Sequence, residues 1–392
     1  MRYLVLVGAI VIQICLGGLY AWSVFVEPLK RDHSLSVAQT QLIFGCLIAT
    51  FTISMVFAGK LLPRLGPRLL AVLSGALFTA GYLVAAASGG AFPLLFLGIA
   101  VLSGIATGFG YVVPLTTCMR WFPHHRGLIT GIAMAGFGGG AVLLSNVAKV
   151  LLGGGLDVLQ LFGWVGLVYG GAILLAALAM RAPAPTPDPR SAPATAIVVL
   201  LKEPFFIALC VGMFCGTFAG LLVIGNLKPL LLSYGVSETA ATLSISAFAV
   251  GNFAGRITWG WAADRYDTGI IPVTLGALAA ALALLHFAAH TQAGATGIAL
   301  AIGFGFGACF VIYAAQVARR YGADRVGSTY PFVFLAYGVA GIAGPPLGGW
   351  LYDSSGGYAM AIGVSIALVL AGGIGTAALL YGPAGQRCLA RG

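Results

Sequence analysis

One arginine lies in the middle of a long apolar stretch of the chain. Residues 244–264 read SISAFAVGNFAGRITWGWAAD, and Arg256 is the only ionisable residue between positions 248 and 261. Asn252 precedes Arg256 by one helical turn, so both polar groups project from one helix face. A charge at the centre of a membrane-spanning helix is costly and is normally retained for an ion or substrate pathway. The stretch therefore predicts that Arg256 receives a negatively charged cargo.

Two structural roles for Arg256 stay open. Its side chain could snorkel to a membrane interface, or it could pair with a carboxylate on a neighbouring helix. About two turns of apolar chain separate it from the nearer end of the stretch, which makes snorkelling a poor fit. All ten acidic residues fall at or near the ends of predicted helices or in loops. For these reasons we favour the cargo-binding role over both alternatives.

The composition indicates an integral membrane protein. The chain has 392 residues, of which 60% are hydrophobic and 8% charged, and its mean hydropathy is +1.01. A soluble chain carries about a quarter charged residues. The net charge of +10 comes from basic residues in short loops beside apolar spans, which is a topology signal. No basic run alternates with aromatics, so we expect the partner to be the lipid bilayer and no nucleic acid.

Several classes of function lack the residues they need. The seven cysteines are scattered without a CxxC motif or a Cys/His cluster, so neither a metal site nor a disulfide framework is predicted. The sequence holds no paired carboxylates, no activated Ser or Cys, and no GxxxxGK[ST] phosphate loop. We therefore expect no enzyme, no catalytic residue, no cofactor and no ATP-driven transport.

Charged and turn residues divide the chain into twelve apolar spans. The predicted spans are 3–28, 38–62, 69–88, 92–119, 127–151, 158–181, 203–232, 239–263, 269–289, 295–318, 327–352 and 358–381. With both termini in the cytoplasm, fifteen of the twenty Lys and Arg residues face inward and four face outward, while Arg256 lies within its span. This asymmetry predicts the orientation and a multi-pass location in the inner (cytoplasmic) membrane of the cell.

The two halves of the chain repeat each other at a spacing near 201 residues. Residues 59–64 match 260–265, residues 26–29 match 227–230, and residues 124–127 match 324–327. A proline-rich stretch lies between the halves. The predicted domains are two pseudo-symmetric six-helix bundles, 1–181 and 203–392, joined by a cytoplasmic linker at 182–202. Parallel repeats of this kind are typical of a large class of transporters with a midplane site between the halves.

The chain resembles the major facilitator superfamily over nearly its whole length. The Gly-x-x-x-Asp-Arg element at 260–265 is similar to the loop signature of that superfamily, and its first copy departs by having Pro63 in place of Asp. Residues 17–22, GGLYAW, resemble the first span of monocarboxylate transporters and oxalate–formate antiporters. Arg256 matches the arginine that both groups use for a carboxylate. The resemblance implies an all-α fold that alternates access by rocking its two halves.

Two departures from these groups narrow the expected cargo. Animal monocarboxylate transporters carry an aspartate where this chain has Asn252, and they have a lysine in the first span that is absent here. Oxalate–formate antiporters carry a second cation in span eleven, where this chain has Tyr337. One central cation suits a single carboxylate better than a dicarboxylate, because a second unpaired anionic group would be costly in low dielectric.

A small anion of the lactate type needs a cation, hydrogen-bond donors and an apolar wall. The predicted substrate-binding residues are Arg256, Asn252, Tyr111, Tyr20, Tyr313 and Tyr337. The residues expected to line the cavity are Cys309, Phe310, Phe334 and Leu19. Each tyrosine could equally bond a neighbouring carbonyl, and an aromatic stripe on one helix face is more often ordinary packing.

The expected function is secondary active transport of a small monocarboxylate such as L-lactate or pyruvate. Proton symport is the simplest coupling, with the proton travelling on or beside the cargo carboxylate. An organic anion exchanger of the oxalate–formate kind is the alternative. We expect the protein to act as a monomer, with the cargo anion and the proton as its small partners.

Overall fold

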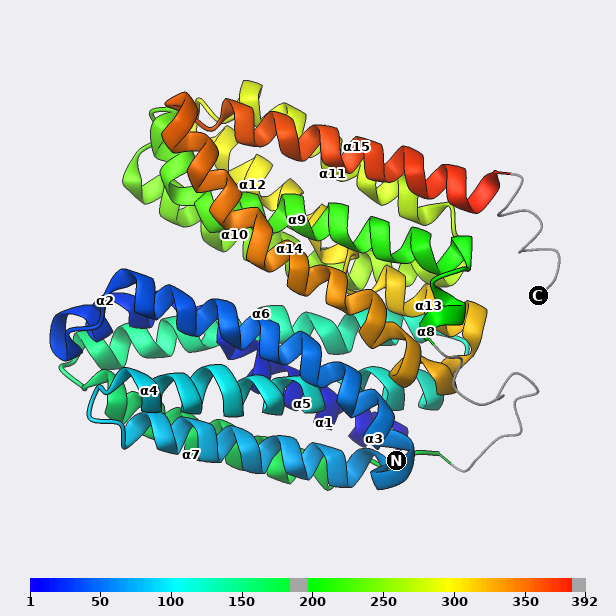
Figure 1. Cartoon of the computed structure of the whole chain (residues 1–392), viewed down its shortest axis with the longest axis horizontal. Helices are drawn as coiled ribbons and strands as arrows, with labels where there is room; N and C mark the ends of the chain where they lie inside the picture. The colour runs from blue at the N-terminus through cyan, green and yellow to red at the C-terminus, as the bar shows by residue number, and fades with distance from the viewer. Residues whose placement is uncertain (184–196, 383–392) are drawn as a thin grey trace. The chain divides into compact units, whose positions relative to one another are not determined.

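The computed structural model describes residues 1–183 and 197–382, and within these ranges every regular element is a helix (Figure 1). Contacts divide the chain into two compact units. The first comprises Met1–Pro123 and Ile132–Pro187, and the second comprises His124–Gly131 and Asp188–Gly392. Most of the predicted linker at 182–202 lies outside the described residues, which resume at the short helix α8 (Ile197–Leu200).

The first unit contains the helices from the N-terminus to residue 177. They are α1 (Arg2–Gly17), η1 (Gly18–Ala21), α2 (Ser23–His33), α3 (Val37–Ala86), α4 (Phe92–Leu95), η2 (Phe96–Ser103), α5 (Gly104–Trp121), α6 (Arg126–Gly153) and α7 (Val158–Ala177). In this unit α3 packs beside both α5 and α7, and α1 packs beside α5 (Figure 1). The first turn of α6 groups with the second unit.

A sharp turn at Gly66 interrupts the long helix α3. The helix begins at a capping box, in which Ser36 Oγ accepts from Gln39 N and Gln39 Oε1 accepts from Ser36 N. Gly66 has φ 76° and ψ 164°, a conformation that glycine adopts without a Cβ clash, and prolines at 63 and 67 remove helical hydrogen bonds around it. The turn lies between the predicted spans 38–62 and 69–88.

The first predicted span is not one straight helix. A short 3₁₀ segment, η1, separates α1 from α2, and α2 continues beyond residue 28 to His33. Ser34 then adopts a left-handed conformation, with φ 56°, and ends the helix. This extension places His33 beyond the end of the span that the apolar pattern predicts.

The second unit contains α8 and the remaining helices of the chain. These remaining helices are α9 (Pro204–Ser233), α10 (Glu238–Arg265), α11 (Ile270–Ala288), α12 (Gln292–Ala308), α13 (Ile312–Tyr321), η3 (Ala323–Arg325), α14 (Val326–Ser355) and α15 (Ala359–Tyr381). Here α10 packs along α12, while α14 and α15 both pack along α9. The predicted span 295–318 falls within one apolar helical stretch, Gln292–Tyr321, in which a short turn at residues 309–311 separates α12 from α13.

The outer surfaces of the helices are apolar. Leu175, Phe287 and Ile374 are each more than 70% exposed. By length and composition, nine helical stretches of the described residues can cross a membrane. An aqueous surface would not carry so many large apolar side chains, so these faces suit lipid. The arrangement of twelve spans with cytoplasmic termini stays a prediction.

Candidate functional site

Arg256 is buried inside the second unit, where Asn252 and Phe310 contact it. Its side chain is on α10 and the residue is 1% exposed. Its Nε donates a 2.7 Å hydrogen bond to Asn252 Oδ1, one turn earlier on the same helix. Its guanidinium carbon lies 4.2 Å from the ring centroid of Phe310. The amide oxygen fixes the plane of the guanidinium, and the aromatic face stabilises its charge.

Small residues let α10 and α12 approach closely enough to bury this charge. A Cβ at Gly251 would collide with the carbonyl oxygen of Leu300, and one at Gly255 with that of Phe304. On the facing helix, a Cβ at Gly303 would collide with the carbonyl oxygen of Phe248. Backbone therefore packs directly on backbone on both sides of Asn252 and just before Arg256, as is typical of helices that associate in lipid.

Phe310 reaches Arg256 because the chain turns between α12 and α13. Cys309, Phe310 and Val311 stand outside both helices, and Val311 has φ −121° and ψ −40°. The Phe310 ring also meets Tyr337 edge-on, at 5.4 Å between centroids, and lies 6.3 Å from Phe334. Both of these α14 residues are fully buried. The turn thus joins the arginine to an aromatic face of α14.

Two predicted site residues pack toward α9. A Cβ at Gly212 would lie 2.6 Å from the hydroxyl oxygen of Tyr313, and one at Gly216 would lie 2.7 Å from Cys309 Sγ. Both Tyr313 and Cys309 are buried. Five predicted residues therefore lie in one cluster in the second unit, and Tyr313 and Cys309 pack against α9. The charged cluster, as named below, is Asn252, Arg256, Phe310, Phe334 and Tyr337.

The two predicted tyrosines of the first unit belong to a neutral cluster around Phe137. The Phe137 ring meets Tyr20 at 5.6 Å and Tyr111 at 5.3 Å, both edge-on. Phe51 lies 5.3 Å from Tyr111. Leu19, in the short 3₁₀ segment beside Tyr20, is buried. The sequence pattern predicts the two tyrosines but neither phenylalanine, because phenylalanine is common in the apolar spans.

Gln13 is a further buried polar residue near these rings, and it is absent from the predicted site. It lies on α1, is fully buried, and its Nε2 donates to the carbonyl oxygen of Tyr111 at 3.4 Å. Within the described residues, Gln13 Oε1 has no hydrogen-bond partner. A lone amide in the apolar run of the first span is a recognisable signal, since polar groups at membrane depth need partners. We include Gln13 in the neutral cluster, with Tyr20, Phe51, Tyr111 and Phe137.

The carboxylate of the Gly-x-x-x-Asp-Arg element has a defined role within the second unit. Asp264, at the end of α10, accepts hydrogen bonds from Gly127 N at 2.6 Å and Leu128 N at 2.9 Å. These amides belong to the first turn of α6, where backbone N–H groups lack partners in the helix. The element thus works as a helix cap. Within the described residues no group of three or more His, Cys, Asp or Glu side chains could hold a metal.

The chain matches the family model of the Major Facilitator Superfamily over residues 6–344, with a second overlapping match over residues 209–387. An uncharacterized MFS-type transporter of Escherichia coli, YhjX, is 28% identical over 87% of this chain and 86% of its own length. The oxalate:formate antiporter of Oxalobacter formigenes is 28% identical over 88% of this chain and 84% of its own. Human monocarboxylate transporter 11 is 26% identical over 88% and 75% of the two chains.

Solved structures share the fold. The crystal structure of the transporter FucP matches with a TM-score of 0.70 at 15% sequence identity, covering 94% of this chain and 98% of FucP. At this level of identity the likeness concerns the course of the helices. It carries no information on the cargo.

Proposed function

The chain belongs to the Major Facilitator Superfamily, and from this we propose that it is a secondary active transporter of small monocarboxylates such as L-lactate or pyruvate. It is a multi-pass membrane protein, and we place it in the inner membrane with twelve spans and both termini in the cytoplasm. Transport proceeds by alternating access, with the two halves of the chain rocking to expose the site to each side in turn.

The buried guanidinium of Arg256 is the observation that carries this proposal. A carboxylate can accept two parallel hydrogen bonds from an arginine, and in a water-poor site such a pair is strong. Asn252 holds the guanidinium through Nε at 2.7 Å, and Phe310 covers one face at 4.2 Å. The planar carboxylate group of a small anion matches this geometry. The names of the oxalate:formate antiporter and the monocarboxylate transporter, among the relatives, support an organic anion as cargo.

The remaining predicted residues complete the proposed site. Tyr20, Tyr111, Tyr313 and Tyr337 carry hydroxyl groups that can bond the 2-hydroxyl or 2-keto oxygen of the cargo. Leu19, Cys309 and Phe334 supply apolar surface for its methyl group. With one cation in the site, a cargo of a single negative charge leaves no second buried anionic group to be neutralised.

Proton symport is the coupling we propose. The acidic residues fall at or near helix ends or in loops, which disfavours a carboxylate side chain as the proton carrier inside a span. The proton instead travels on or beside the cargo carboxylate, and its charge offsets that of the anion during the crossing. Transport without any dependence on a proton gradient would rule this coupling out.

Uptake of labelled L-lactate into proteoliposomes with an imposed inward proton gradient tests the proposal. Arg256→Ala is compared with wild type, and Arg2→Ala, which alters an exposed arginine near the N-terminus, is the matched control. We expect gradient-driven uptake in wild type and Arg2→Ala and its loss in Arg256→Ala. Uptake that ignores the gradient but requires internal oxalate or formate would establish an exchanger. Equal uptake by wild type and Arg256→Ala would make Arg256 a structural residue.

A further inference from the structure

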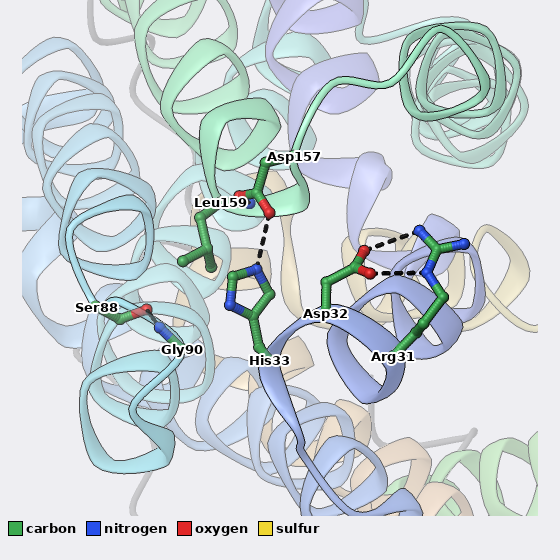
Figure 2. A network of polar contacts seen from close by, with 7 residues as sticks. All are labelled: Arg31, Asp32, His33, Ser88, Gly90, Asp157 and Leu159. Carbon is green, nitrogen blue, oxygen red and sulfur yellow. Dashed lines mark hydrogen bonds and ion pairs between the residues drawn. The ribbon is translucent and has the colours of Figure 1, made fainter.

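A histidine and an aspartate from distant parts of the first unit meet at one end of its helices (Figure 2). His33, the last residue of α2, places Nε2 2.9 Å from Asp157 Oδ2. Their side chains are 14% and 36% exposed. The distribution of basic residues predicts that this end faces outside. The pair is thus partly shielded from water, but protons can reach it.

Asp157 binds two partners with its two oxygens. While Oδ2 faces the imidazole, Oδ1 accepts a 2.8 Å hydrogen bond from Leu159 N and caps the N-terminus of α7. A carboxylate in this position is already favoured by the helix dipole and the free N–H groups of the first turn. The same side chain therefore ties the end of α2 to the start of α7.

The connection between α3 and α4 packs on the other side of the imidazole. Gly90 has φ +86°, and a Cβ there would lie 2.9 Å from His33 Cβ and Nδ1. Ser88 Oγ accepts from Gly90 N at 3.2 Å and holds this turn in place. Three connections of the first unit, those at α2–α3, α3–α4 and α6–α7, thus meet at one side chain.

The His33 ring contacts the carboxylate of Asp157, although a second carboxylate, that of Asp32, lies close by. Asp32, the residue before His33, is held by Arg31 through bonds of 2.7 and 2.9 Å. That contact, more than the nearby imidazole, keeps the pKa of Asp32 below its ordinary value. Further along α2, Glu27 and Lys30 pair at 3.1 Å. The α3–α4 turn contributes only Ser88, Gly89 and Gly90 here, which are not ionisable.

We infer that His33 and Asp157 form a pH-sensitive clasp that tightens when the outside becomes acidic. An imidazole gains its charge between about pH 8 and pH 5. The neutral ring makes an ordinary hydrogen bond to Asp157, whereas the charged ring makes a charge-assisted bond, which is roughly twice as strong. The clasp is therefore strongest when His33 carries a proton and Asp157 does not. It weakens as the pH rises. This device is independent of the cargo and so goes beyond the proposed function.

Hydrogen exchange of the full-length protein in detergent micelles at pH 5.5 and 8.0 tests the clasp without any cargo. Exchange rates are corrected for the intrinsic chemical rate at each pH, and the peptides of interest cover residues 86–92 and 154–160. In wild type we expect exchange to be at least about threefold slower at the acidic pH, because local opening breaks the clasp. His33→Gln retains a side-chain N–H donor but cannot gain charge, and we expect its corrected rates to be the same at both pH values.

Two further variants identify the partner of the imidazole. Asp157→Asn retains a side-chain oxygen for Leu159 N but loses the charge, and it should also remove the pH dependence. Asp32→Asn and the matched control His290→Gln should retain it. Wild-type rates that do not depend on pH, pH dependence that persists in His33→Gln or Asp157→Asn, or its loss in Asp32→Asn would each overturn the inference. None of these outcomes bears on whether the protein carries monocarboxylates, so the two proposals fail separately.

Discussion

The charged cluster of the second unit and the neutral cluster of the first are both built from aromatic rings and one amide, and they differ in one further kind of side chain. Both pack tyrosine and phenylalanine rings edge-on at centroid distances of 5 to 6 Å. Both also contain one buried amide, Gln13 in the first unit and Asn252 in the second. Only the second adds a guanidinium, Arg256.

The two amides show what the added charge does. Asn252 Oδ1 accepts a 2.7 Å bond from Arg256 Nε, so its strongest acceptor is committed to orienting the cation. Gln13 instead uses its donor on a backbone carbonyl at 3.4 Å. Under the proposed function, the second unit would hold the anion and the first would offer hydrogen bonds and apolar surface. In that case, placing the charge in one unit would let a single carboxylate set the orientation of the cargo.

Replacing the guanidinium of the charged cluster by an ammonium group should produce the largest effect on transport. Arg256→Lys retains the charge but loses the planar fork, the bond to Asn252 Oδ1 and the contact of the guanidinium with the Phe310 ring. We expect lactate uptake to fall about 10- to 100-fold, as charged hydrogen bonds of about 1.5–3 kcal/mol imply. The measurement is the initial uptake rate per molecule of folded protein. Uptake within twofold of wild type would show that charge alone suffices.

Disturbing the close approach of α10 and α12 should produce the next largest effect, a loss of thermal stability. A Cβ at Gly255 would collide with the carbonyl oxygen of Phe304, so Gly255→Ala must push the helices apart. We expect a cost of about 1–3 kcal/mol and a melting temperature lower by about 3–10 °C. Gly276→Ala is the control, since a Cβ there meets open space. The corresponding variant of the neutral cluster, Gly17→Ala, would collide with Phe137 and should behave like Gly255→Ala. A melting temperature of Gly255→Ala equal to that of the control would contradict the packing argument.

The sequence predicted the helices and the chemistry of single residues better than it predicted which residues meet. Apolar runs between charged and turn residues place the helices, because lipid demands long stretches with internally bonded backbone. Arg256 and Asn252 share a face by spacing alone, and the structure confirms their contact. The turn that brings Phe310 onto Arg256 carries no proline and left no signal in the pattern. The His33–Asp157 contact joins residues 124 positions apart, a pairing that no local pattern encodes.

Removing single tyrosine hydroxyl groups from either cluster should have a smaller effect on uptake. Tyr337→Phe alters the charged cluster and Tyr111→Phe the neutral one, and neither changes the packed rings. If either hydroxyl bonds the cargo, lactate uptake should fall about 2- to 10-fold, the range of one neutral hydrogen bond. Propionate, which lacks the 2-hydroxyl group, is the control substrate and should be unaffected. Equal effects on both substrates would assign the hydroxyl to a structural bond within its unit.

The smallest expected effects come from exposed ion pairs on the two units. The geometry of each pair predicts which of them contributes more to stability. In the second unit Lys228 Nζ bonds Glu238 Oε1 at 2.8 Å and joins the end of α9 to the start of α10. In the first unit Arg31 bonds its neighbour Asp32. Each partner lowers the pKa of its carboxyl, chiefly by the hydrogen bond, from ordinary values of 4.5 for Glu238 and 3.8 for Asp32. A carboxyl group whose pKa is lowered in the folded protein stabilises the fold at pH values above its ordinary pKa. This stabilisation is lost as the pH falls through the lowered pKa.

Melting temperatures of Lys228→Ala and Arg31→Ala at pH 7 and pH 3 test this ranking. The Arg31–Asp32 pair joins adjacent residues and can also form in the unfolded chain, so its loss should hardly change stability. The Lys228–Glu238 pair spans ten residues and needs the folded turn between the helices. We therefore expect Lys228→Ala to melt at most about 2 °C below wild type at pH 7, because exposed pairs are weak, and the difference to shrink at pH 3. A larger loss in Arg31→Ala than in Lys228→Ala would show that the local pair matters more to the first unit than its geometry suggests.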